Sequence, residues 1–119
     1  MSNRGSVAVV LPAYNEEETI EAVIRDFNKF LPDAEIIVVN NNSSDRTADI
    51  AQSVLEELNV SSRRVLNEVR QGKGYAVRRA FLEVDADIVI MADADTTYPA
   101  SQAEELIKHV SSGEYDIVI

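Results

Sequence analysis

The stretch Ile88-Val89-Ile90-Met91-Ala92-Asp93-Ala94-Asp95 carries the clearest structural signal in this 119-residue chain. Its continuous apolar run is typical of a strand buried on both faces, as in a parallel sheet covered by helices. Aspartate is a poor strand former, so we expect Asp93 and Asp95 just past the carboxyl end of that strand. In open α/β sheets this edge is where ligands bind.

Asp93 and Asp95 lie one residue apart, and two crowded carboxylates repel each other unless a cation lies between them. Hard divalent ions prefer oxygen ligands, so the pair is a candidate metal site. The alternative is a strand followed by an acidic Asx turn, and this stretch alone leaves both interpretations open.

Apolar runs and helical patterns alternate along the rest of the chain. Strands are expected at residues 7–11 (stopped by Pro12), 35–39, near 64–66, 88–91 and 116–119. Short connections between such alternating elements predict right-handed crossovers. The fold class is therefore α/β: a doubly wound, Rossmann-like, mainly parallel sheet of about five strands with helices on both faces.

The first helix is expected to open with Asn15 as its cap, because Glu18 stands at capping-box spacing. Ser44 or Asp45 is expected to cap the second helix. Apolar residues at helical spacing predict the inward-facing side of the first three helices. These residues are Ile20, Val23, Ile24, Phe27, Phe30 and Leu31 in the first helix, Ala48, Ala51, Val54, Leu55 and Leu58 in the second, and Ala76, Val77, Ala80 and Phe81 in the third. A last helix would pack Leu106, Ile107 and Val110.

Length and composition favour a single globular domain over residues 1–119. With 11 Lys and Arg against 21 Asp and Glu, the net charge is −10, which argues against a nucleic-acid partner. No apolar run approaches the ~20 residues of a membrane span, and no signal peptide is evident, so a cytoplasmic location is expected. Because the sequence stops within an apolar run at Ile119, we expect the N-terminal part of a longer protein.

Four polar loops should meet at the carboxyl edge of the sheet, at residues 12–16, 40–45, 70–74 and 93–98. In the third loop Lys73 stands between two glycines at a helix start, where backbone amides and the helix dipole favour phosphate. A plain turn is the more common explanation of Gly-Lys-Gly alone. Opposite a carboxylate pair, it becomes half of a metal–diphosphate clamp.

Other phosphate-binding classes fit less well. No G-x-G-x-x-G follows the first strand, and the P-loop pattern is absent. Asp93-Ala94-Asp95-Thr96-Thr97 resembles the D-x-D-x-T motif of haloacid-dehalogenase-type phosphatases, but that motif follows the first strand of its family. The residues after Asp95 leave no room for the other catalytic motifs of such a phosphatase.

Four segments together resemble the nucleotide-binding half of a family 2 glycosyltransferase with the GT-A type fold. They are Leu11-Pro12-Ala13-Tyr14-Asn15-Glu16, Val38-Val39-Asn40-Asn41-Asn42-Ser43-Ser44-Asp45-Arg46-Thr47, Gly72-Lys73-Gly74 and Met91-Ala92-Asp93-Ala94-Asp95, with Tyr98-Pro99 beyond them. The likeness covers about residues 7–119. Within the family it is strongest to dolichol- or polyprenyl-phosphate sugar synthases.

The resemblance implies an inverting, metal-dependent enzyme that binds a UDP- or GDP-linked sugar, with a polyprenyl phosphate as one candidate acceptor. Asp93 and Asp95 would bind Mg²⁺ or Mn²⁺ that bridges the donor diphosphate. The other implied contacts are the base and ribose pocket at Pro12, Ala13, Tyr14 and Glu16, Asn41 at its side, and Lys73 near the base or phosphates. Each of these loop residues taken alone is explained at least as well by a structural role. The catalytic base is expected beyond Ile119.

Two departures from the family pattern affect these expectations. Family members often carry aspartates where Asn40 and Asn41 stand, and Thr97 replaces the Gln of the lipid-phosphate sugar synthases. Two other functions stay open: a stand-alone nucleoside-diphosphate-binding module without turnover, and an α/β interaction domain with a vestigial aspartate pair. The open edge of the last strand also predicts a homodimer, and a longer form is a candidate for membrane association.

Overall fold

The computed structural model describes residues 7–58, 63–92 and 117–118 of the chain. Five strands form one sheet: β1 (Val7–Ala13), β2 (Glu35–Asn40), β3 (Arg63–Asn67), β4 (Ile88–Met91) and β5 (Ile117–Val118). Their order is β3-β2-β1-β4-β5, and every neighbouring pair is parallel. The predicted doubly wound parallel sheet is confirmed.

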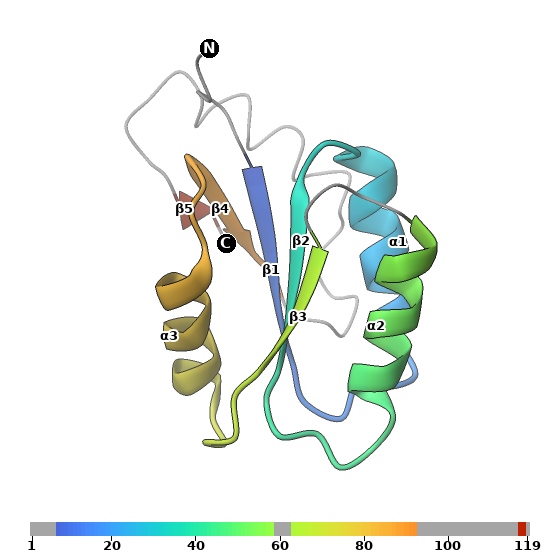
Figure 1. The fold of residues 1–119 in the computed structure, drawn as a ribbon, viewed down its shortest axis with the longest axis vertical. Coiled ribbons are helices and arrows are strands. Elements are labelled where there is room, and N and C mark those ends of the chain that lie inside the picture. The colour runs from blue at the N-terminus through green and yellow to red at the C-terminus, as the bar shows by residue number, and fades with distance from the viewer. Residues whose placement is uncertain (1–6, 59–62, 93–116, 119) are drawn as a thin grey trace.

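Helices cover both faces of this sheet, as Figure 1 shows. Helices α1 (Ile20–Phe30) and α2 (Thr47–Leu58) lie on one face, and α3 (Lys73–Glu83) lies on the other. Successive residues of β1 therefore enter different cores: Val9 packs on the α1 and α2 side, and Val10 packs on the α3 side. This two-sided burial is the physical reason for the continuous apolar runs.

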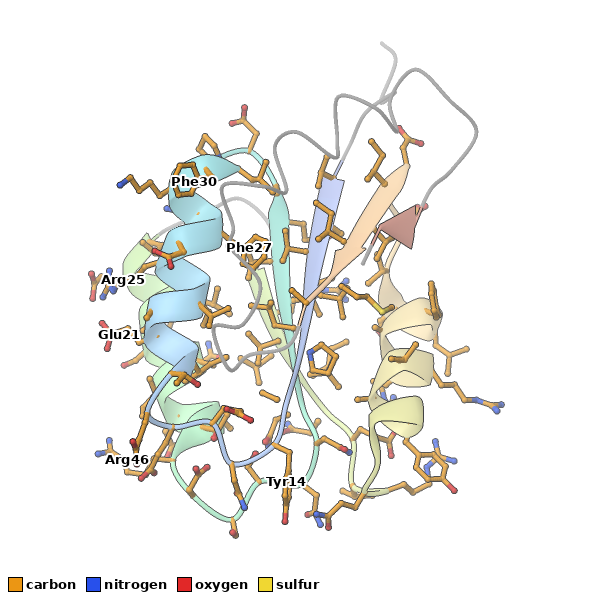
Figure 2. All side chains as sticks on the ribbon, turned by 180° about the vertical axis from the view of Figure 1, so that it is seen from behind. Tyr14, Glu21, Arg25, Phe27, Phe30 and Arg46 are labelled. Carbon is orange, nitrogen blue, oxygen red and sulfur yellow. The ribbon has the colours of Figure 1, made fainter. Side chains whose placement is uncertain are left out.

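Helix α1 shows how the apolar periodicity places side chains. Phe27 is buried against the sheet, whereas Glu21 and Arg25 project outward (Figure 2). Arg25 pairs with Glu21 at 2.8 Å and with Glu57 of α2 at 3.0 Å. The predicted inward face of α1 is confirmed, and an ion pair joins its outer face to α2.

The first strand does not stop at Pro12, as the sequence suggested, but runs through it to Ala13. Val10 O accepts from Ala92 N of the β4 side, and Ala13 O accepts from Asn41 N of the β2 side. Because backbone groups alternate along a strand, the missing N–H of Pro12 faces β4. The described pairing of β1 with β4 ends at Val10 and Met91, whereas pairing with β2 continues to Ala13.

The predicted cap of the first helix is wrong. Asn15 has a φ of 53°, and α1 begins only at Ile20, after a turn in which Glu16 O accepts from Thr19 N and Ile20 N. Glu18 is therefore not in a capping box. The Asn15 side chain faces the second loop instead, because that loop offers it hydrogen-bonding partners.

Helix α3 differs from its prediction at one position. Ala76 and Ala80 are buried and Val77 is partly buried, but Phe81 is 47% exposed. Phe81 lies about one helical turn after Val77, on the same side of the helix. Because Val77 is itself only partly buried, Phe81 lies at the edge of the buried stripe. The small alanines form the close contact with the sheet.

Two further expectations concern the far end of the chain. The predicted helix with Leu106, Ile107 and Val110 lies outside the described residues. Strand β5 ends the sheet on one side in the part of the chain that the structure describes, and self-association through it stays a prediction. Among the helices of that same part, none is long and apolar enough to cross a bilayer.

The two glycines around Lys73 provide a stability test. Gly72 has a φ of 134°, which L side chains rarely adopt, whereas Gly74 lies inside α3 with no atom within 4 Å of an added Cβ. We expect Gly72→Ala to lower the free energy of unfolding by about 1–3 kcal/mol. We expect Gly74→Ala to raise it by up to about 1 kcal/mol, because alanine favours helix. Urea unfolding of both variants measures this, and equal effects would contradict the backbone assignment.

Candidate functional site

Three strand-to-helix loops come together at the carboxyl edge of the sheet, at the lower end of Figure 1. They cover residues 14–19 after β1, residues 41–46 after β2 and residues 68–72 after β3. The loops are short and polar, and each leads to a helix start whose first N–H groups have no partner within the helix. The hydrogen bonds between these loops define the site.

Asn15 connects the first loop to the second. Its backbone N–H donates to Ser43 Oγ at 3.0 Å, and its Oδ1 accepts from Ser44 N at 2.9 Å. The left-handed backbone of Asn15 allows both bonds at once, since asparagine tolerates this conformation. The side chain that the sequence assigned to a helix cap instead joins two loops.

The loops that lead into α1 and α2 then supply acceptors to each other. Glu16 N donates to Thr47 Oγ1 at 2.8 Å, and Glu17 N donates to Asp45 Oδ2 at 3.2 Å. In return, Arg46 N donates to the Glu17 carboxylate at 2.9 Å. This reciprocal capping fixes the two loops against each other, because each contains acceptors that the other's amides need.

Asp45 is the central acceptor of this contact. Its Oδ1 accepts from Thr47 N at 2.9 Å and from the Thr47 hydroxyl, so of the two predicted caps Asp45 serves the start of α2. Burial tends to raise the pKa of Asp45, but the hydrogen bonds from Thr47 and Glu17 outweigh it, and the pKa is lowered. The carboxylate form is therefore the one the fold stabilises.

Asn41 connects the second loop to the third. The residue is 4% exposed, and its Nδ2 donates to Glu68 O at 3.2 Å and to Arg70 O at 2.7 Å. Its Oδ1 accepts from Gly72 N at 2.9 Å. The family resemblance implies that Asn41 lies beside a ligand pocket, and the structure shows that its amide group bonds the backbone of the third loop.

Glu68 is a buried carboxylate that the sequence interpretation missed. It accepts from Arg70 N at 2.9 Å and from Arg70 Nε at 3.1 Å, and Arg79 Nε lies 3.4 Å from its other oxygen. Hydrogen bonding by the Arg70 side chain is the main reason that the pKa of Glu68 falls to about 2. Arg70 also lies over the Tyr75 ring, 4.7 Å from its centroid. The sequence feature that could have indicated its role is that Glu68 is the single acidic residue in the basic segment 63–79.

The predicted site residues lie at this edge as far as the structure describes them. Ala13 is buried and accepts from Asn41 N at 2.8 Å, which brings the first two loops together. Tyr14 is 44% exposed at the loop end of the molecule (Figure 2). The others are Pro12, which is half-buried in β1, Glu16 in the first loop and Lys73, the first residue of α3. Asp93 and Asp95 lie outside the described residues, directly after the buried Ala92.

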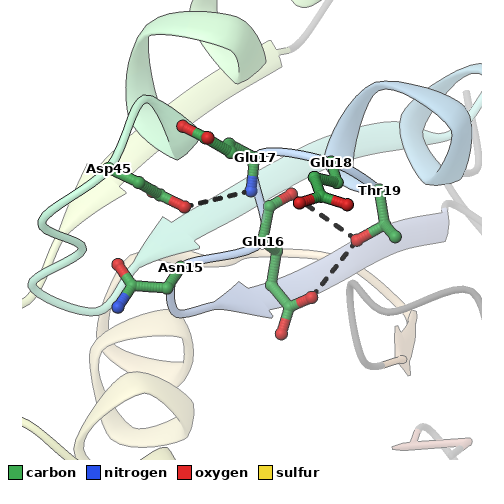
Figure 3. A pocket seen from close by; sticks show the side chains of 6 residues that line it. All are labelled: Asn15, Glu16, Glu17, Glu18, Thr19 and Asp45. Atoms are coloured by element: carbon green, nitrogen blue, oxygen red, sulfur yellow. Dashed lines mark hydrogen bonds between the residues drawn. The ribbon is translucent and has the colours of Figure 1, made fainter.

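A pocket of about 290 Å³ lies beside the first loop, and Figure 3 shows the side chains around it. Its lining residues are Asn15, Glu16, Glu17, Glu18, Thr19 and Asp45. Four of these six carry carboxylates, so the pocket repels a diphosphate. Among the residues that the structure describes, no cluster of three or more His, Cys, Asp and Glu side chains could hold a metal.

Removing the Asp45 carboxylate tests the contact between the loops that lead into α1 and α2. We expect Asp45→Ala to lower the free energy of unfolding by about 1 kcal/mol near neutral pH, as for other lost helix caps. Because the pKa of Asp45 is lowered in the folded chain, its contribution is full above the ordinary value of 3.8 and disappears as pH falls through the folded value. Asp85→Ala, at an exposed position, controls for the lost charge. Equal effects of the two substitutions would contradict the assignment.

Glu68 predicts a second acid-dependent contribution. Its folded pKa of about 2 lies below the ordinary 4.5, so its stabilisation is full above about pH 4.5 and is lost as pH falls toward 2. We expect the stability difference between the natural chain and Glu68→Gln to shrink over that range. Chemical unfolding from pH 7 to pH 3 measures the difference, with exposed Glu18→Gln as control. A difference that is constant with pH would contradict a charged, paired Glu68.

Comparison with known proteins shows which family the chain resembles. The family model described as glycosyl transferase family 2 matches residues 8–119. Protein RfbJ of Shigella flexneri is 42% identical over 114 residues, which cover 96% of this chain and 83% of that protein. A dolichyl-phosphate hexose transferase of Haloferax volcanii is 33% identical over 112 residues, covering 94% of this chain but only 46% of the relative.

Solved structures give the same result. Glucosyl-3-phosphoglycerate synthase of Mycobacterium tuberculosis, in complex with Mn²⁺, uridine-diphosphate and phosphoglyceric acid, matches with a TM-score of 0.75 and 31% identity. That match covers 92% of this chain and 40% of the synthase. A mannosyltransferase of Pyrobaculum calidifontis, in complex with GDP-Man and Mn²⁺, matches with a TM-score of 0.76 and 27% identity, covering 88% of this chain and 31% of the enzyme. The chain belongs to glycosyltransferase family 2 and has the nucleotide-binding architecture of the GT-A fold.

Proposed function

We propose that this chain is the donor-binding part of an inverting, metal-dependent glycosyltransferase that takes a UDP- or GDP-linked sugar. One observation carries the proposal: in a family 2 chain, three loops at the carboxyl edge of a parallel sheet are hydrogen-bonded into one polar surface. Ligands of open α/β sheets bind at this edge. The solved relatives in complex with UDP or GDP-Man support a nucleoside diphosphate as the ligand.

In this proposal the first loop receives the base and ribose through Pro12, Ala13, Tyr14 and Glu16. The exposed Tyr14 ring offers a stacking surface, and the first two loops already meet where Asn41 N donates to Ala13 O. The diphosphate lies toward Lys73, because the start of α3 presents backbone amides and a positive dipole end.

Asp93 and Asp95 would hold Mg²⁺ or Mn²⁺, and Asp93 would also contact the donor. The donor set fits, since carboxylate oxygens suit hard divalent cations and no cysteine competes in the chain. When bound, such an ion stabilises the negative charge of the departing nucleoside diphosphate. Mn²⁺ accompanies the ligands in the two solved relatives, which supports a divalent ion without separating Mg²⁺ from Mn²⁺.

Transfer itself needs an acceptor held in line with the anomeric carbon. In an inverting reaction the acceptor oxygen bonds to that carbon from one side while the bond to the diphosphate breaks on the other. We propose a polyprenyl phosphate as the acceptor, on the basis of relatives named dolichyl-phosphate hexose transferase and dolichol-phosphate mannosyltransferase. We assign no catalytic base within residues 1–119, and a cytoplasmic location stays a prediction.

A second candidate is a module that binds a nucleoside diphosphate without turnover. The chain spans 83% of RfbJ but less than half of the dolichyl-phosphate relative, so a curated relative of about this length exists. Metal-dependent binding of a nucleotide sugar, with no nucleotide released when a polyprenyl phosphate is added, would favour this module. Release of the nucleoside diphosphate would favour the transferase.

Calorimetric titration tests the donor site. UDP, GDP and their sugar conjugates are titrated into the chain with and without Mn²⁺. We expect metal-dependent binding in the natural chain, and we expect Asp93→Asn/Asp95→Asn to reduce the affinity to the level measured without metal. The loss follows because amides are weaker ligands for hard cations than carboxylates.

The chain contains its own matched control. Asp85-Ala86-Asp87 repeats the Asp-Ala-Asp triplet at the opposite end of β4. Asp85→Asn/Asp87→Asn removes the same charge away from the proposed site and should leave nucleotide affinity unchanged. Full metal-dependent binding by the first double variant, or no binding by the natural chain in any condition, would overturn the proposed function.

A further inference from the structure

We propose that the chain docks on an anionic lipid surface through the outward side of α3 and the loop that precedes it. We call this region the α3 surface, and its exposed side chains are Val69, Arg70, Tyr75, Arg78, Phe81 and Leu82. Docking there goes beyond the proposed function, because it involves a second kind of partner and does not depend on nucleotide binding.

Exposed apolar side chains gather on the α3 surface. Five large hydrophobic residues are exposed in the part of the chain that the structure describes, and four of them lie here: Val69, Tyr75, Phe81 and Leu82. Val69 is 75% exposed and Leu82 is 69% exposed, whereas neither α1 nor α2 carries an exposed large hydrophobic residue. Apolar side chains clustered on one surface mark a site of interaction.

The spacing of these residues along α3 brings them to one side of the helix. Tyr75, Arg78 and Leu82 follow one another at intervals of three and four residues, so they form one stripe. Ala76 and Ala80 lie on the opposite side and pack into the core against the sheet. The stripe therefore points away from the sheet, where a flat partner can reach it.

The same segment is basic. Residues 69–82 contain four Lys and Arg residues and none of the 21 acidic residues of the chain. Arg78 is exposed, and no acidic side chain among the described residues pairs with it. Arg70 lies over the Tyr75 ring and pairs with the buried Glu68, yet 53% of its side chain stays exposed. Arginines beside exposed aromatic and aliphatic side chains suit a lipid interface, where the charged group meets the headgroups and the apolar parts enter below them.

The net charge of −10 does not prevent this contact, because the acidic residues gather elsewhere. Helices α1 and α2 expose five of them: Glu21, Asp26, Asp49, Glu56 and Glu57. Both helices lie on the other face of the sheet from α3 (Figure 1). Packed layers are about 10 Å apart, so these acids lie roughly 20 Å from the α3 surface. That exceeds the Debye length of about 10 Å at about 0.1 M salt, so their repulsion of an anionic surface is screened.

The shape of the α3 surface favours a lipid surface over a folded protein. A helix rises about 1.5 Å per residue, so the stripe from Tyr75 to Leu82 is only about 10 Å long. A specific protein interface buries about 800 Å² on each partner, which is more than one convex helix flank supplies. A fluid bilayer needs no complementary groove, and anionic headgroups supply the charge that arginine attracts.

Vesicle flotation tests the docking. We expect the chain to bind vesicles of phosphatidylserine mixed with phosphatidylcholine, and to bind vesicles of phosphatidylcholine alone at least about tenfold more weakly. Arg78→Gln should weaken binding to the mixed vesicles about fivefold, because one cationic contact is lost. Arg46→Gln removes the same charge beside the start of α2, away from α3 (Figure 2), and should leave binding unchanged.

Three flotation results would overturn the proposal. They are failure to bind the mixed vesicles, equal binding to both kinds of vesicle, and equal losses in the two arginine variants. A chain that binds neither vesicle but elutes from a sizing column as a dimer would show that the α3 surface joins two copies instead.

An introduced tryptophan tests which side of the molecule meets the lipid. The natural chain contains no tryptophan, so a single one reports only on its own surroundings. With mixed vesicles, we expect the emission of Leu82→Trp to shift to the blue and to be quenched by brominated lipid. Ala22→Trp, at an exposed position of α1, should show neither change. Quenching of both variants, or of neither while the chain still floats, would overturn docking through α3.

Discussion

The carboxyl edge of this molecule depends on how the backbone amides of the strand-to-helix loops find acceptors. In a parallel sheet every strand delivers such a loop to the same edge, where neighbouring loops are crowded. Here the acceptors come from adjacent loops: Asp45 and Thr47 serve the first loop, and Glu17 serves the second. The edge is thus one connected hydrogen-bonded surface, and a ligand there meets loops that are already fixed.

Charge is distributed unevenly around this surface. Residues 63–79 contain six of the eleven Lys and Arg residues of the chain and only one of its 21 acidic residues, Glu68. That acid is buried and paired with Arg70 and Arg79. The basic segment leads directly into the start of α3, so a chain with a net charge of −10 can still offer a locally favourable site to a diphosphate.

The sequence was sufficient to predict the alternation of strands and helices, the parallel sheet and the loops that meet at one edge of it. This was possible because buried strands and amphipathic helices have distinct periodicities. It failed where a residue serves a distant partner. Asn15 has the sequence context of a helix cap, yet it bonds Ser43 and Ser44, nearly thirty residues away. Glu68 was missed as well, because its ion pair with Arg79 joins the third loop to helix α3, eleven residues further along the chain.

The asparagine at position 41 shows why a departure from a family pattern needs a structural explanation before a functional one. A shorter hydroxyl side chain cannot supply two donors, and a carboxylate at neutral pH supplies none. In this chain the three bonds to the third loop therefore suit an amide at this position. The same choice keeps a negative charge out of the edge where a diphosphate is proposed to bind. Loop geometry and ligand electrostatics thus favour the same residue at position 41.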